Sequence, residues 1–213
     1  MTKTQLVILW GLGVLVIGVL GALGLLLSQT GRPQPSVPVE VQAAVPSALT
    51  TQASYRLPET PHSAQNLYAQ AEQAAQRWQP DAALVSAAAS WSFASLDNFS
   101  RPIDWTFQFY SPSTARVYVI SVSGTTVTPI RETLSPYSLP VIDVERWQID
   151  SYQALNTWLN RGGGAFLKRT AIVDVSIRLA RPQGNAPVWM VVGIDDSGQA
   201  IQSERLNAYE GNP

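Results

Sequence analysis

The hydrophobic and polar positions divide the chain into an apolar run, a proline-rich stretch and a long periodic region. Residues 6–27 contain no charged, amide or hydroxyl side chain. At about 1.5 Å rise per residue, a helix over this run is about 33 Å long, enough to cross a hydrocarbon core of about 30 Å. The run therefore predicts a transmembrane helix.

Two interpretations compete for this run, a retained anchor and a cleaved signal peptide. The apolar part of a signal peptide is about 7 to 15 residues long and ends in a small-x-small site. The nearest such site, Ala22-Leu23-Gly24, lies inside the run. This position and the length of the run both favour the anchor. Lys3 precedes the run, whereas only Arg32 follows it closely. Because positive residues stay cytoplasmic, we expect a single-pass protein of the cell membrane with residues 1–5 inside and residues 28–213 outside.

Small residues mark one side of the predicted anchor. Gly11, Gly18 and Ala22 lie at spacings of seven and four, which would give a smooth helix face that another helix can approach. Glycine is also simply frequent in membrane helices, so both interpretations stay open.

The stretch after the anchor, residues 28–62, is rich in Pro, Gln, Ser, Thr and Ala. Such a composition buries too little apolar surface to fold, and its prolines favour extended geometry. We therefore expect a linker, with the folded region beginning near Ser63.

Residues 63–134 show a helical period followed by a strand period. Apolar residues at spacings of three and four predict a helix over Ser63–Trp78, with Ser63 as its cap. Strands are expected at Ala82–Phe93, Trp105–Phe109, Val117–Ser121 and Thr126–Arg131, the middle pair forming a hairpin around Tyr110–Ser113.

Residues 135–213 repeat this order. An extended segment over Val141–Ile149 leads to a helix that starts at Asp150, where the acid and Gln153 have capping-box spacing. Gly162, Gly163 and Gly164 are expected to end that helix. Strands are expected at Ile172–Leu179, Pro187–Ile194 and Gln199–Leu206, with a tight turn over Asp195–Gly198.

The two halves share one plan, in which a helix precedes strands, one strand carries a tryptophan and a glycine turn follows. Trp105 with Gly124 corresponds to Trp189 with Gly198. We interpret residues 63–134 and 135–213 as a duplicated unit, and the predicted fold class is α+β, with helices on one face of an antiparallel sheet.

The second half resembles the PepSY type of extracytoplasmic domain. Matching residues are the glycine-ended helix of Asp150–Gly164 and the segment Trp189–Gly198, a strand leading into an Asp-x-x-Gly turn. The resemblance covers Asp150–Leu206 and implies a non-catalytic module outside the membrane, of a type sometimes linked to peptidase propeptides or inhibition. It supplies no active-site residue.

Composition excludes several functions. The formal net charge is −1 and the basic residues are scattered, so nucleic acid is not an expected partner. Cysteine is absent, which removes disulfides, thiol nucleophiles and thiolate metal sites. The one histidine, His62, lies in the linker just ahead of a helix. We therefore expect no catalytic residue, no cofactor and no metal.

Other candidate sites have plainer explanations. Asp143 and Glu145 would share one face of the extended segment, where a solvated pair is favoured over an acid site. The Asp195-Asp196 pair offers too few oxygens for calcium. The triple glycine follows its helix, whereas a phosphate loop precedes one. Asn98 begins a glycosylation sequon, a short pattern that is frequent by chance.

Six tryptophans lie beyond the anchor. Trp105 and Trp189 fit core positions of the two units, while Trp91, Trp147 and Trp158 are candidate partner contacts, because tryptophan is enriched in interfaces. Core and interface remain equal alternatives for these three.

The sequence thus predicts a non-catalytic binding or regulatory module, held by one helix in the bilayer, that contacts an envelope protein. The alternative is an accessory subunit of a multi-subunit membrane complex, such as an energy-conversion assembly, with the glycine-bearing helix packed inside it.

Overall fold

The computed structural model describes residues 54–170 and 173–210. The predicted tail and anchor, with Gly11, Gly18 and Ala22, lie outside these residues. Within the described part of the chain, no helix is both long and apolar enough to cross a membrane.

Seven antiparallel strands form one sheet in the order β4-β3-β2-β1-β5-β6-β7. The strands are β1 (Ala83–Trp91), β2 (Trp105–Ser111), β3 (Arg116–Ser123), β4 (Thr126–Leu134), β5 (Val173–Ala180), β6 (Val188–Asp195) and β7 (Ile201–Asn207). The two halves of the chain meet where β1 pairs with β5. They therefore form one continuous sheet.

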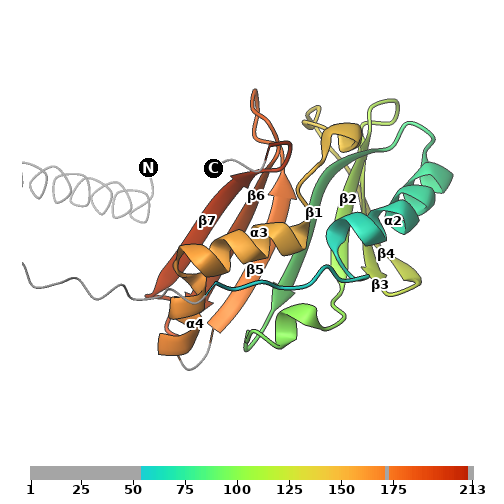
Figure 1. Ribbon diagram of the computed structural model, residues 1–213. Helices are drawn as coiled ribbons and strands as arrows, with labels where there is room; N and C mark the ends of the chain where they lie inside the picture. The colour runs from blue at the N-terminus through green and yellow to red at the C-terminus, as the bar shows by residue number, and fades with distance from the viewer. Residues whose placement is uncertain (1–53, 171–172, 211–213) are drawn as a thin grey trace, which may run out of the picture. The chain divides into compact units, whose positions relative to one another are not determined.

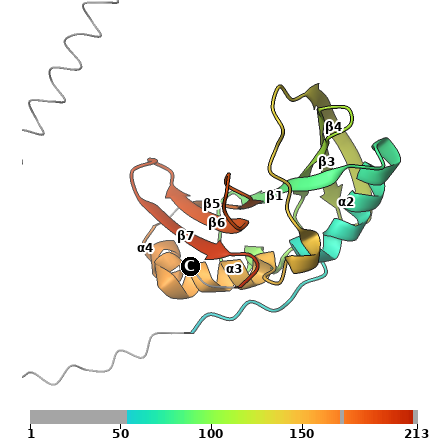
Figure 2. The same ribbon diagram turned by 90° about the horizontal axis from the view of Figure 1, so that it is seen from above.

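The main helices lie together on one side of this sheet (Figures 1 and 2). They are α2 (Ala64–Trp78), α3 (Ser151–Trp158) and α4 (Gly164–Arg169). The segment η3 (Leu159–Gly163) between the last two is kinked, since Arg161 and Gly162 have non-helical φ and ψ angles. Two short 3₁₀ turns, η1 (Asn98–Ser100) and η2 (Val144–Arg146), lie in the connections. The predicted α+β class, with helices on one face of an antiparallel sheet, is confirmed.

Cap residues fix the N-termini of α2 and α3. The Ser63 side chain accepts a hydrogen bond from the Asn66 N–H, and Asp150 and Gln153 form the predicted capping box of α3. The Asp150 carboxylate also accepts the N–H of Gln65 at 3.1 Å. One buried acid therefore satisfies amide groups at the N-termini of both helices.

The core lies between the helices and the covered face of the sheet. Alternate side chains of β5 are buried there, and so are Trp105, Phe107 and Phe109 of β2. Trp105 and Trp189 are fully buried, with ring centroids 6.1 Å apart in an edge-to-face arrangement. This contact lies in one hydrophobic cluster that both halves share.

Three expectations about local structure are wrong. Residues 141–149 contain the η2 turn, whereas an extended segment was expected. The glycines interrupt a helix that continues, since only Gly162 has a positive φ (120°) and α4 begins at Gly164. The linker expected to reach residue 62 is bound to η3 and α3 from Tyr55 onward.

Candidate functional site

The sheet face opposite the helices carries no helix of the described part of the chain. Ser86, Tyr110 and Val119 on this face are buried, whereas most of its side chains in β5, β6 and β7 are exposed. One row of paired residues crosses all seven strands on this face. From β4 to β7 it consists of Thr128, Ser121, Thr106, Ala88, Arg178, Met190 and Arg205. The row runs from short side chains in the first half to larger apolar and basic ones in the second, so the two halves offer different surfaces.

Hydroxyl groups lie at the centre of this face. Between β1, β2 and β5 lies a shallow hollow of about 300 Å³, whose polar lining is Ser90, Asp104, Thr106, Ser176 and Arg178. The hydroxyls, the carboxylate and the guanidinium can hydrogen-bond a polar group of a partner. The hollow therefore suits binding by polar contacts at the centre of the sheet.

The second half carries exposed apolar side chains. Met190, Ile194 and Ile201 are 42%, 37% and 60% exposed, and Ile194 pairs directly with Ile201 across β6 and β7. We call these three residues the uncovered apolar strip. Arg178 and Arg205 flank Met190 in the neighbouring strands. Apolar surface rimmed by polar groups is typical of an interaction site.

Phe93, just after β1, is 69% exposed and has a φ of 54°. Three bonds fix the backbone around it. Its N–H donates to Asp174 Oδ1 at 3.3 Å, its carbonyl accepts from Asn98 Nδ2 at 3.0 Å, and the next N–H donates to Val173 O at 2.7 Å. A bulky residue in the left-handed region is strained. An exposed aromatic ring held at such a cost is a candidate contact at this end of the sheet.

Sequence reasoning missed the uncovered apolar strip, although a signal for it was present. The β5 strand alternates strictly, whereas Val188–Ile194 in β6 is apolar on both faces apart from Gly193. In a sheet with one solvated face, polar residues are expected at alternate positions. Met190 and Ile194 depart from that pattern.

The three tryptophans for which core and partner contact stayed open are buried. Trp91, Trp147 and Trp158 are 8%, 6% and 0% exposed and belong to the core cluster. Of the two alternatives, the arrangement favours the core for their side chains. Among the described residues, the Trp91 Nε1–H has no hydrogen-bond partner.

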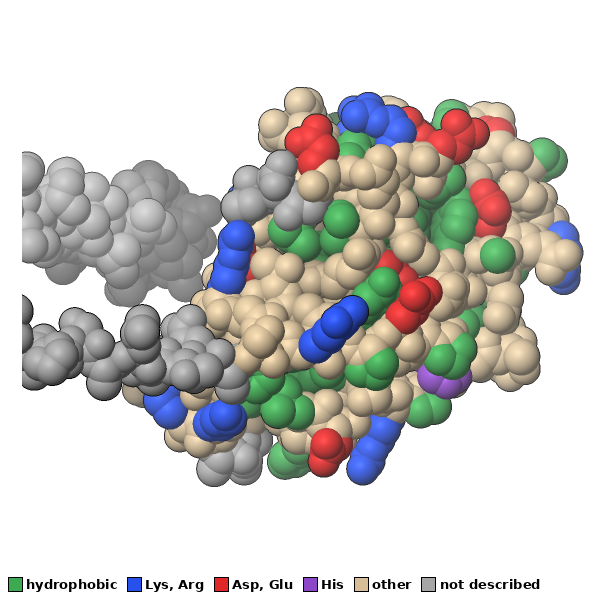
Figure 3. Space-filling view, viewed as in Figure 1, with side chains coloured by type: hydrophobic (Ala, Val, Ile, Leu, Met, Phe, Trp, Pro, Cys, Tyr) green, Lys and Arg blue, Asp and Glu red, His purple; other side chains and the backbone are tan. Residues whose placement is uncertain are grey.

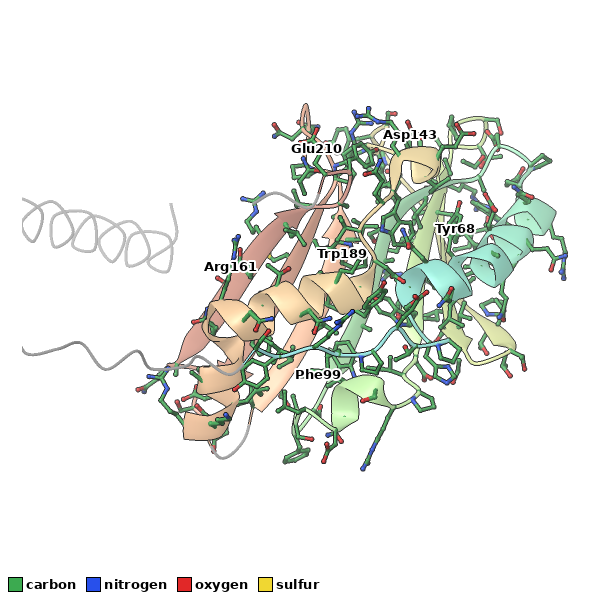
Figure 4. All side chains as sticks on the ribbon, viewed as in Figure 1. Tyr68, Phe99, Asp143, Arg161, Trp189 and Glu210 are labelled. Atoms are coloured by element: carbon green, nitrogen blue, oxygen red, sulfur yellow. The ribbon has the colours of Figure 1, made fainter. Side chains whose placement is uncertain are left out.

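Most of the core indoles bind carbonyl groups of connecting segments. Trp147 and Trp189 both donate to the Ile149 carbonyl, at 2.7 and 2.6 Å. Trp105 donates to the His62 carbonyl at 2.9 Å. A buried indole brings a large apolar surface and one donor, so these residues attach loops to the core. Trp189 belongs to the hydrophobic core cluster and Tyr68 packs against it; both are labelled in Figure 4.

The acidic candidates do not form a cluster. Asp143 and Glu145 are exposed at the η2 turn, near one end of the sheet (Figure 4). Asp195 accepts bonds from Ser197 Oγ and from the N–H groups of Gln199 and Ala200. The Ser197 hydroxyl, more than any other contact, lowers the pKa of Asp195 below its usual value. This carboxylate therefore stabilises the predicted turn.

His62 and the glycines of the triple-glycine segment have positions that packing explains. His62 is half-buried and precedes the α2 cap. Gly163 and Gly164 allow the close approach of the rings of Trp158 and Tyr55. Among residues 54–170 and 173–210, no three or more His, Cys, Asp or Glu side chains are placed to hold a metal ion.

Comparisons with protein-family models, with curated proteins and with solved structures gave no significant match to the chain.

Proposed function

We propose that the protein is a single-pass, membrane-anchored, non-catalytic module that binds an envelope protein through its uncovered sheet face. The observation that carries this proposal is the uncovered apolar strip. Met190, Ile194 and Ile201 lie on the face that no helix of the described chain covers. Burying such side chains against a partner is favourable by about 25 cal/mol per Å² of apolar area.

The hollow next to the strip supports a protein partner. A standard interface covers about 800 Å² on each side, more than three side chains provide, so a partner would extend over β1 and β2. The hydroxyl groups there provide hydrogen bonds for the polar rim, and Arg178 and Arg205 favour acidic groups opposite Met190.

The two halves support descent from a duplicated, PepSY-like unit. In each, a helix precedes three consecutive antiparallel strands: α2 leads to β1, β2 and β3, and α3 with α4 leads to β5, β6 and β7. The first strands of the two units pair with each other. The second strands carry Trp105 and Trp189, which meet in the core.

We further propose that residues 6–27 anchor the module in the cell membrane, with residues 1–5 in the cytoplasm and the sheet domain outside. The support is the length of the apolar run and the position of Lys3. The partner is then a protein that meets the domain on the outer side of the membrane.

Site-specific photocrosslinking in intact cells tests this proposal. A photoreactive residue at Ile201 lies on the uncovered apolar strip, whereas one at Gln76 is exposed on α2 and serves as the matched control. We expect one envelope-protein adduct from position 201 and none from position 76. Met190→Glu should abolish the adduct, because the carboxylate would replace apolar contact area and would neutralise Arg178 and Arg205, which favour acidic groups of the partner.

Two results would contradict the proposal. Absence of any specific adduct from position 201 would mean that the strip is not a contact. An integral-membrane adduct that survives Met190→Glu but is lost with Gly11→Leu and Gly18→Leu would favour the accessory-subunit alternative.

A further inference from the structure

Four residues at intervals of four form a stripe along α3, η3 and α4. The segment Tyr55–Leu57, the cyan trace beside α3 in Figure 1, contacts all four of them: Asn156, Asn160, Gly164 and Lys168. We call this set the asparagine stripe. Its partner segment runs from the α4 end toward the start of α3, so the stripe receives an extended chain along its length.

Each asparagine forms a pair of hydrogen bonds with the backbone of one residue. The Tyr55 N–H donates to Asn160 Oδ1 at 2.8 Å, and Asn160 Nδ2 donates to the Tyr55 carbonyl at 2.9 Å. The Leu57 N–H donates to Asn156 Oδ1 at 2.6 Å, and Asn156 Nδ2 donates to the Leu57 carbonyl at 3.2 Å. All four bonds go to the backbone, so they do not depend on which side chains the segment carries.

The spacing of the two amides matches an extended chain. Four residues of α-helix rise about 6 Å, and two residues of an extended strand advance about 6.6 Å. Asn156 and Asn160 therefore meet alternate residues of the segment. Tyr55 and Leu57 are half-buried while Arg56 is exposed, the period of two that an extended segment on a surface produces.

The stripe also has a seat for an aromatic ring. A Cβ on Gly164 would overlap the ring of Tyr55, so only glycine leaves room for it at this position. The Lys168 Nζ lies 5.3 Å from the centroid of that ring, within range of a cation–π contact. Leu57 packs against the edge of the core cluster. The two side-chain positions therefore favour an aromatic and an aliphatic residue separated by one.

The bound segment lies on the molecular surface. Figure 3, which views the helix side, shows charged residues of both signs dispersed over this face. Residues 54, 56, 58 and 59 are exposed. Within the described residues, the backbone bonds of Tyr55 and Leu57 are those to the asparagine stripe. Release of the segment would expose two amides that water can hydrogen-bond, so its replacement carries little penalty.

We propose that the asparagine stripe is a binding groove for extended polypeptides, which Tyr55–Leu57 occupy in cis. The ligand is an extended segment of a partner protein with an aromatic residue, any residue and then an aliphatic residue. Its backbone takes the four amide bonds, and its aromatic ring takes the Gly164 seat when the resident segment leaves. The groove lies on the helix side of the sheet, so this inference stands apart from the proposed role of the uncovered face.

A peptide exchange experiment on the full chain in mild detergent tests the groove. The probe is a fluorescent peptide with the sequence of residues 52–60. Wild type is compared with Tyr55→Gly/Leu57→Gly, which weakens the resident segment. We expect the variant to bind the probe at least tenfold more tightly, because competition in cis is reduced. Adding Asn156→Ala and Asn160→Ala should weaken that binding about tenfold or more, since four bonds are lost.

A backbone-methylated probe is the matched control. N-methylation of the peptide at the positions of Tyr55 and Leu57 keeps both side chains and removes the two donors that the asparagines accept. We expect about tenfold weaker binding. Equal binding of both probes, or equal binding by wild type and a folded variant, would overturn the proposal.

If the Gly variant does not fold, a spin label tests whether the resident segment exchanges with added peptide. The chain has no cysteine, so Arg56→Cys gives one labelling site on the resident segment of an otherwise unchanged protein. Millimolar unmodified peptide should mobilise the label, and the methylated peptide should not. A spectrum unchanged by the unmodified peptide would show that the segment does not exchange.

Discussion

Replacing Gly163 or Gly193 by alanine should destabilise the protein, although both replacements would ordinarily stabilise it. Gly163 has helical φ and ψ angles of −57° and −41°, and Gly193 lies inside β6. Alanine adopts both conformations without strain, and in a helix it is favoured over glycine by about 1 kcal/mol. Backbone propensity alone therefore predicts a gain in stability at both positions.

Packing against Trp158 turns this expected gain in stability into a loss. A Cβ on Gly163 would overlap the fused ring atoms of this indole, and one on Gly193 would lie 2.8 Å from its Cζ2. The indole cannot move freely, since it is fully buried and its Nε1–H donates to the Gln202 carbonyl at 3.0 Å. Overpacking of a rigid core costs about 1–3 kcal/mol. With the upper value for Gly163, the net loss is about 2 kcal/mol.

Thermal unfolding of a fragment of residues 51–213 measures this loss. For a domain of this size we expect Gly163→Ala to lower the Tm by about 4–8 °C. In a Trp158→Phe background the alanine should cost at least 1 kcal/mol less, because the smaller ring relieves the overlap. A rise in Tm with Gly163→Ala, or the same penalty in both backgrounds, would refute the reasoning.

Four other outcomes follow from the contacts described. Asp150→Ala should lower the free energy of unfolding by about 2 kcal/mol, because it removes the carboxylate that accepts N–H groups at two helix N-termini. Asp150→Asn should cost less. Thermal unfolding measures both. The Ser111 hydroxyl is the main donor to the Asp81 carboxylate and lowers the pKa of Asp81. The stability advantage of wild type over Asp81→Asn should therefore hold at pH 7 and vanish as the pH falls through that lowered pKa. Thermal melting at a series of pH values measures this. A fragment of residues 63–213 should melt below the fragment of residues 51–213, since it lacks the segment bound to α3. Phe93→Gly should raise the free energy of unfolding by about 1 kcal/mol in urea titration, because it relieves left-handed strain.

Much of the fold could be predicted because its signals are local. The caps at Ser63 and Asp150 marked the helix starts. The alternation in Val173–Leu179 marked a strand with one buried face, and the Asp195–Gly198 turn carries its own hydrogen bonds. Each of these signals depends on residues close together in sequence, where backbone preferences act directly.

Features that depend on distant residues escaped prediction. Tyr55 and Leu57 looked like linker, because the asparagines that hold them lie about a hundred positions away. Trp158 could have been core or interface, since burial of an indole is decided by which helix and strand meet around it. Phe93 gave no sign of a left-handed backbone, because phenylalanine does not favour that region and neighbouring chain segments impose it.

Cysteine labelling in intact cells tests the central claim most directly. Ser203 is exposed on the uncovered face beside the apolar strip, and Gln76 is exposed on α2. With Ser203→Cys and Gln76→Cys in separate proteins, a membrane-impermeant maleimide should label both equally after purification. In cells we expect labelling at position 76 and protection at position 203, because a partner covers the sheet face of an extracytoplasmic domain. Equal labelling at both positions in cells would contradict the docking face, and no labelling at either would contradict the proposed orientation.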